Sequence, residues 1–179
     1  MPPNFDEVKK NSDFIIPFKG LGLGEHHYDF EIDKPFFESY ELLNIRGGQL
    51  KLSVEMEKES NLMVFLFHFS GAVILQCDRC LEDYSQVLTG DFRLIVKFAE
   101  KFEDVSDEMI TIPFDENRMD LKQYIYEYIN LMLPIKRVHP DDENGNSTCK
   151  PEMLDRLDKH TKHTTDPRWD ALKKLKTNQ

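Results

Sequence analysis

The chain has 179 residues, enough for one domain whose core needs no support from disulfides. Its 40% hydrophobic content and 13 phenylalanines exclude a disordered or collagen-like chain. A formal net charge of −10 argues against a protein that coats nucleic acid through a generally basic surface. The charge is uneven, because residues 150–179 carry eight Lys/Arg against five Asp/Glu. The sequence therefore indicates an acidic body followed by a mildly basic tail.

The apolar segments are short and the cysteines are few. The N-terminus lacks a basic stretch followed by an apolar one, and the longest apolar run, Leu62–Phe67, is far below the roughly 20 residues of a membrane span. We therefore expect a soluble, cytoplasmic protein without membrane contact. Three cysteines are an odd number and do not form a disulfide framework.

The first half of the chain predicts strands. Residues 14–40 indicate short strands around a glycine-rich turn, Gly20–Gly24, which we interpret as a turn and not as a phosphate loop because no helix pattern follows it. Residues Leu50–Met56 alternate between apolar and polar side chains, which predicts a half-buried antiparallel strand. Residues Phe92–Phe98 predict another long strand by the same alternation.

The segment Asn61–Leu75 is apolar on both faces. Its odd and even positions carry Met63, Phe65, Phe67 and Phe69 on one side and Leu62, Val64, Leu66 and His68 on the other. We expect a central strand that is covered on each side. Ser70-Gly71 interrupts the pattern and predicts a bulge or bend.

After residue 100 the pattern changes. Residues 100–108 form an acidic connector, which we interpret as a solvated loop. Helical spacing of apolar residues predicts a helix over residues 119–133, with Asp120 as its cap and Pro134 ending it. Residues 135–150 indicate a polar loop, and two short helices follow, the second opened by Asp166 and Pro167.

These elements predict an α+β fold: an antiparallel sheet or partial barrel, one packed helix and a short helical C-terminal segment. We expect residues 1–135 to form the α+β body, which contains a Cys-x-x-Cys hairpin turn. Residues 136–179 would form a polar loop and a helical tail, packed on the same domain or extending from it.

The Cys-x-x-Cys turn suggests a metal site. Cys77 and Cys80 lie between two predicted strands, at the spacing that two ligands of a tetrahedral metal require. His139 and Cys149 are the other plausible ligands, and together the four form a candidate Cys3His zinc site. Four protein ligands leave no open position, so the zinc would be structural and would contribute on the order of 10 kcal/mol to local folding.

Three other interpretations of these side chains stay open. Cys77 and Cys80 could form a thioredoxin-like redox pair, although that motif normally begins a helix. The thiols could be reduced and metal-free, with His139 an ordinary loop residue. A catalytic Cys–His pair is the third alternative, but no oxyanion or orienting signature accompanies it.

The basic tail offers a candidate binding surface. Asp166–Lys176 predicts a short amphipathic helix whose apolar side carries Trp169. Cationic side chains could contact phosphates, and the single Trp could stack on a base or fill a protein groove. The candidate RNA- or partner-binding residues are Arg79, Arg168, Trp169, Lys173, Lys174 and Lys176. Alternatively, the Trp docks on the parent sheet and the lysines are merely solvated.

Four segments of the chain, in order, resemble the YceD family, whose members are called large ribosomal RNA subunit accumulation proteins. The segments are the glycine-rich turn leading to His26–Phe30, then Cys77–Glu82, Ile129–Ile135 and Asp166–Leu175. Many relatives carry a cysteine-rich cluster after the Leu-Pro segment, where this chain has only His139 and Cys149. The resemblance therefore does not by itself imply a bound metal.

The resemblance implies a non-enzymatic ribosome-biogenesis factor that supports the accumulation of large-subunit (23S-type) ribosomal RNA. The acidic body opposes broad RNA binding, but charge is screened beyond about 8–10 Å, so Arg79 and the tail could still contact a precursor rRNA. Alternatively, a basic ribosomal protein is the direct partner. The competing functions are a thiol redox enzyme using Cys77 and Cys80, and a zinc-stapled adaptor for a non-ribosomal partner.

Overall fold

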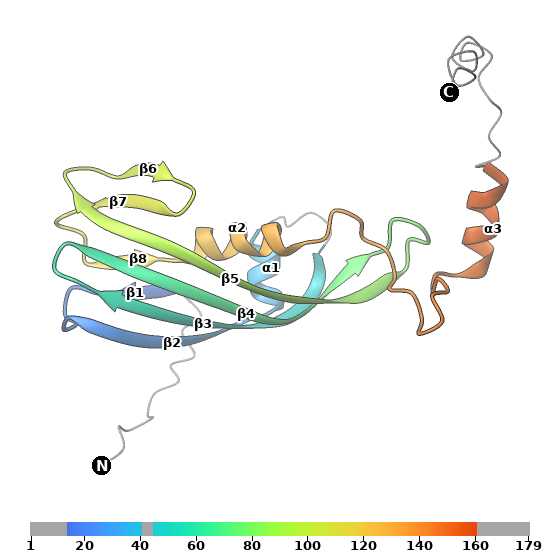
Figure 1. The fold of residues 1–179 in the computed structure, drawn as a ribbon, viewed down its shortest axis with the longest axis horizontal. Helices are drawn as coiled ribbons and strands as arrows, with labels where there is room; N and C mark the ends of the chain where they lie inside the picture. Colours follow the sequence, from blue (N-terminus) through green and yellow to red (C-terminus); the bar gives the residue numbers. More distant parts are fainter. Residues whose placement is uncertain (1–13, 41–44, 161–179) are drawn as a thin grey trace, which may run out of the picture. The chain divides into compact units, whose positions relative to one another are not determined.

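The computed structural model describes residues 14–40 and 45–160, which fall into two compact units (Figure 1). The first unit joins the residues up to Gln76 to Asp83–Arg137. The second joins the turn Cys77–Glu82 to the residues from Val138 onward. The helix expected over residues 166–176 lies outside the described residues.

The described part of the first unit contains eight strands and two helices. In chain order they are β1 (Ile15–Pro17), β2 (Gly24–Ile32), α1 (Lys34–Ser39), β3 (Ile45–Lys58), β4 (Leu62–Gln76), β5 (Asp83–Ala99), β6 (Glu103–Ser106), β7 (Met109–Pro113), β8 (Arg118–Asp120) and α2 (Lys122–Met132). The second unit contains α3 (Pro151–His160). None of the described helices is long and apolar enough to cross a membrane.

Six strands form one open sheet in the order β2-β3-β4-β5-β7-β6, and β1 pairs separately with β8. The α+β class is confirmed, with an open sheet and not a closed barrel. The pairs from β2 to β5 are antiparallel, as their alternation predicts, whereas β5 and β7 pair in parallel. The expected loop at residues 100–108 is wrong in part, because Glu103–Ser106 forms the exposed edge strand β6.

One face of the six-stranded sheet carries the core. Phe65, Phe67 and Phe69 of β4 lie on this phenylalanine face and are at most 1% exposed. Tyr128 of α2 stacks on Phe92 of β5 with ring centroids 4.4 Å apart, and it also contacts Phe67 at 5.1 Å. The helix α2 therefore packs on the phenylalanine face of β4 and β5 (Figure 1).

The remaining elements of the first unit cover the same face. Phe14 contacts Phe36 of α1 at 5.2 Å and Phe30 of β2 at 5.5 Å, and Phe30 lies beside Leu52 of β3 on the phenylalanine face. Phe18, just after β1, contacts Phe98 of β5 at 5.7 Å. Both helices and the β1–β8 pair thus gather on one side of the sheet, and the fold of this unit has two layers.

The opposite face, which we call the open face, has no covering element among the described residues of the first unit. Leu66 of β4 is 45% exposed there, and its neighbour Val64 is only half-buried. Within the first unit, this strand is therefore covered on one side only and not on each side as expected. The reason is that α1, α2 and the β1–β8 pair all lie on the phenylalanine face.

Local sequence explains how the two helices begin. The N-cap of α2 is Leu121 and not Asp120 as expected, and the side chain of the cap residue makes no hydrogen bond. The Asp120 carboxylate, one residue earlier, accepts a hydrogen bond from the backbone N–H of Lys122 at 2.9 Å. The helix α2 ends at Met132, just before Leu133 and Pro134, as expected. The helix α1 was not expected from the sequence; Pro35 in its first turn presets the helical φ angle.

At Ser70–Gly71 we expected a bulge or bend; there is no bulge in the register, and Gly71 is required instead by a close backbone approach. The register between β3 and β4 is continuous through Gly71 and shifts instead between Ile45 and Gly47. Gly71 has φ of +150°, and a Cβ atom there would lie 2.3 Å from the carbonyl oxygen of Gln49. The two strands can pair at this point only because the residue lacks a side chain.

We expect Gly71→Ala to lower the free energy of unfolding by roughly 3 kcal/mol, because the new Cβ meets rigid backbone at an unfavourable φ. Urea denaturation measures the loss. Gly90→Ala is the matched control, since its Cβ would meet the Sδ atom of Met132, at 2.7 Å, which lies near the end of a flexible side chain. Equal losses in the two variants would contradict this account of Gly71.

Candidate metal centre

The turn between β4 and β5 directs two cysteines to one side. The backbone N–H of Cys77 donates to the carbonyl of Glu82 at 2.8 Å, and the N–H of Leu81 donates to the carbonyl of Cys77 at 2.9 Å. Leu81 closes the turn in the left-handed region with φ of +60°. This geometry buries Cys77 and Cys80 while Arg79 between them is exposed.

A second loop supplies the other two donors. The Asp142 carboxylate accepts hydrogen bonds from the backbone N–H groups of Asn144 at 2.9 Å and Asn146 at 2.8 Å. The Thr148 hydroxyl donates to the carbonyl of Pro140 at 2.7 Å. These bonds fold the polar segment back on itself, so that His139 and Cys149, which flank it, come together.

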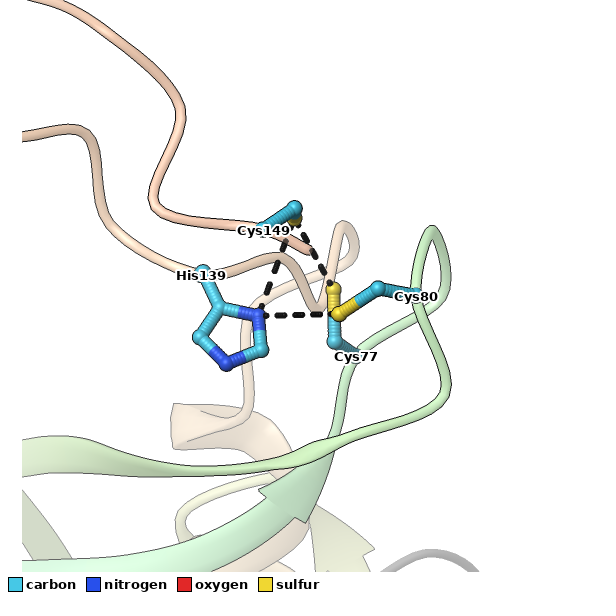
Figure 2. A group of neighbouring side chains, drawn as sticks. All are labelled: Cys77, Cys80, His139 and Cys149. Carbon is cyan, nitrogen blue, oxygen red and sulfur yellow. Dashed lines mark hydrogen bonds between the residues drawn. The ribbon is translucent and has the colours of Figure 1, made fainter. Parts of the chain in front are cut away.

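The four predicted ligands form one cluster within the second unit, and their donor atoms all lie within 4.8 Å of one another. Figure 2 shows the three sulfurs and the imidazole pointing toward a common centre. The Sγ atoms of Cys77 and Cys149 are 3.6 Å apart. The Nδ1 atom of His139 lies 3.4 Å from the Sγ of Cys80 and 3.7 Å from the Sγ of Cys149.

These separations match the edges of a tetrahedral zinc site. With Zn–S near 2.3 Å and Zn–N near 2.0–2.1 Å, tetrahedral geometry places two sulfurs about 3.8 Å apart and a sulfur and a nitrogen about 3.6 Å apart. The sulfurs of Cys77 and Cys149 are also much farther apart than the roughly 2.05 Å of a disulfide. The cluster therefore has the donor chemistry and the spacing to hold a metal ion.

Burial and charge also favour a cation at this centre. The three cysteines are at most 4% exposed. Burial raises the pKa of the Cys77 thiol, but hydrogen bonds to the backbone of Cys80, Arg79 and His139 outweigh it and lower that pKa to about 6. For Cys149, burial and the adjacent sulfurs raise the pKa. Neighbouring thiols oppose each other's ionisation, and a bound divalent cation would remove that opposition.

An ion pair that the sequence did not predict joins the two segments of the cluster. The Lys150 ammonium, one residue after Cys149, donates to the Glu82 carboxylate, two residues after Cys80. This hydrogen bond lowers the pKa of Glu82 and raises that of Lys150. Both residues flank metal-ligand candidates, but only the fold shows that they meet.

The predicted binding residues are not brought together among the described residues. Arg79 is exposed at the cysteine turn. The other five candidates, Arg168, Trp169, Lys173, Lys174 and Lys176, lie outside the residues that the structure describes. The binding role of these six residues therefore stays a prediction.

Comparisons with known proteins identify the family. A comparison with curated proteins finds no match, and a comparison with solved structures finds none either. The model of the YceD family, described as large ribosomal RNA subunit accumulation protein, matches residues 65–176. That segment is more than half of the chain and includes most of β4, all of β5 and α2, and all four clustered side chains. The chain belongs to the YceD family.

Proposed function

We propose that the chain is a non-enzymatic ribosome-biogenesis factor that supports the accumulation of large-subunit (23S-type) ribosomal RNA in the cytoplasm. It acts by binding precursor rRNA or a ribosomal protein. The family match over residues 65–176 carries this proposal, because that family is described by its role in accumulation of this RNA. The match also includes Arg79 and the basic segment up to Lys176.

In this proposal Cys77, Cys80, His139 and Cys149 hold one structural Zn²⁺. Zinc supplies a folding constraint here, because residues 138–150 are mostly exposed and bury little apolar surface of their own. The imidazole would bind through Nδ1, the atom that faces the sulfurs. Three thiolates and one imidazole fill a tetrahedral shell, which leaves no position for a substrate and fits a binding protein.

Cells lacking the protein should have a lower ratio of large- to small-subunit ribosomal RNA. Quantitative electrophoresis of total RNA measures the ratio, and reintroduction of the unaltered chain should restore it. Crosslinking in cells, followed by identification of the bound RNA and proteins, should recover large-subunit precursors or their proteins. The proposal would be contradicted if the ratio of ribosomal RNAs were unchanged and the crosslinked material contained no ribosomal RNA or protein.

The redox alternative makes a different prediction for the same protein. If Cys77 and Cys80 were a redox pair, they would form a reversible disulfide, and zinc would not be retained at one equivalent. Native mass spectrometry separates the two cases. One metal ion per chain supports the structural centre, whereas a loss of two protons without metal supports the redox pair.

A further inference from the structure

The open face of the sheet is hollowed along its length. Three adjacent hollows have volumes of about 720, 530 and 250 Å³. Ser53 and His68 line both the first and the second, and Glu55 and Leu66 line both the first and the third. We call this continuous depression the open-face groove, and it lies wholly within the first unit.

The centre of the groove is apolar. Val64 and Leu66 follow each other along the open face of β4, and Leu66 is 45% exposed. The largest hollow is not confined to the open face, because its lining also includes Phe67, Phe92 and Tyr128, which contact one another on the phenylalanine face. It extends to Leu131 of α2, whose side chain is 72% exposed. Large apolar side chains exposed together in a depression mark a binding surface.

The groove is also strongly acidic. Eight carboxylates line the three hollows, against only two permanent cations, Lys51 and Arg93. The carboxylates are Glu25, Asp29, Glu31, Glu55, Glu57, Asp91, Asp107 and Glu108. The Arg93 guanidinium already donates to the Glu108 carboxylate from Nη2 at 2.6 Å and from Nε at 3.1 Å. The groove therefore presents an excess of negative charge around its apolar centre.

This combination selects the class of ligand. Phosphates of RNA would meet repulsion from the carboxylates, and the groove has no basic row to compensate for it. A polypeptide segment that alternates Lys or Arg with branched apolar residues is complementary in both respects. Its cations would meet the carboxylates, and its apolar side chains would cover Leu66 and Leu131.

We infer that the open-face groove binds a basic polypeptide segment with interspersed apolar residues. This inference rests on the proposed function, because it names a basic protein, and not RNA, as the direct partner at this surface. Binding there would cover the apolar face of β4 that the rest of the first unit leaves exposed. It would also shield the cations of the partner from premature contact with RNA.

The test uses the full-length chain and a short synthetic peptide in which Lys and Arg alternate with Val. Fluorescence anisotropy should show saturable binding that weakens as salt rises, because charge supplies part of the affinity. Replacing Val with Ser in the peptide, or Lys and Arg with Glu, should abolish binding. Binding that survives either replacement would overturn the inference.

Matched variants locate the site. The groove variant Glu55→Gln, Glu57→Gln, Leu66→Ser removes two charges and one exposed apolar side chain, so the dissociation constant should rise roughly tenfold. The control variant Asp115→Asn, Glu116→Gln, Phe114→Ser removes the same kinds of group from exposed positions outside the hollows and should bind as the unaltered chain does. Equal affinities of the two variants would overturn the inference.

Three other occupants are outcomes of the same experiment, and each would overturn the inference. Saturable binding of a labelled RNA oligonucleotide to the unaltered chain in the absence of the peptide, lost in the groove variant, would identify RNA. A dimer that the groove variant dissociates would identify a second copy of the chain. A tenfold gain in affinity on changing Lys173 and Lys174 to Glu would identify the chain's own tail.

The proposed function is tested separately in cells. If the groove variant restores the ratio of ribosomal RNAs as well as the unaltered chain does, only the groove inference fails. If the unaltered chain itself has no effect on that ratio, the proposed function fails, whatever the peptide shows.

Discussion

Cys149→Ser should release the proposed zinc ion and unfold the segment 138–150. The substitution removes one of four ligands, and structural zinc contributes a binding free energy on the order of 10 kcal/mol to such a site. The hydrogen bonds of Asp142 and Thr148 lie at exposed positions and are too weak to replace that contribution. Native mass spectrometry should show the loss of one metal ion, and hydrogen exchange should show lost protection in this segment.

Substitution of a second ligand, and of a histidine outside the cluster, tests the assignment further. His139→Asn removes a proposed ligand and should release zinc as Cys149→Ser does, whereas His68→Asn alters an exposed histidine on the open face and should retain one equivalent. A strong chelator should reproduce the effect of His139→Asn on the unaltered chain. Retention of a full equivalent of zinc in both Cys149→Ser and His139→Asn would contradict the Cys3His assignment.

Phe67→Ala should cost about 4 kcal/mol of the free energy of unfolding of the first unit, because truncating a buried phenylalanine leaves a cavity that packed neighbours cannot fill. Phe67 is 1% exposed and contacts the ring of Tyr128 at 5.1 Å. Its loss therefore weakens the contact between β4 and α2 as well. Urea denaturation followed by circular dichroism measures the change.

The adjacent residue is the control for Phe67. Leu66 points to the open face and is 45% exposed, so Leu66→Ala should cost less than about 1 kcal/mol. Leu66→Ala should also weaken binding of the basic peptide, because Leu66 lines two of the three hollows of the open-face groove. A stability loss from Leu66→Ala as large as that from Phe67→Ala would contradict the assignment of the two faces.

The regular strands were predictable because alternation is a local signal. The segments around Leu50–Met56 and Phe92–Phe98 form strands in the structure, and both extend beyond the predicted limits. The coverage of β4 was not predictable, because both its faces are apolar and hydrophobicity does not say which elements will pack there. The helix α1 has only six residues, too few for a helical period to emerge.

Pairing between strands that are not adjacent in the chain was also not predictable from the sequence. The strand β7 pairs in parallel with β5, and no pattern within residues 100–113 indicates that partner. At the candidate metal centre, the sequence predicted the four candidate ligands but not every contact between the two segments. The Cys77–Cys80 spacing is itself a ligand signal, and residue chemistry suggested His139 and Cys149, but the Glu82–Lys150 pair depends on two segments meeting.

The division of the four donors between two distant segments sets the order in which this protein can mature on the ribosome. Synthesis proceeds from the N-terminus, so the strands β4 and β5 and the turn with Cys77 and Cys80 leave the exit tunnel well before His139 and Cys149. A nascent chain therefore exposes the Cys77 and Cys80 side chains to oxidation until the later segment emerges. If the four donors hold the proposed zinc ion, its capture must wait until both segments have emerged, after the strands of the sheet have been synthesised.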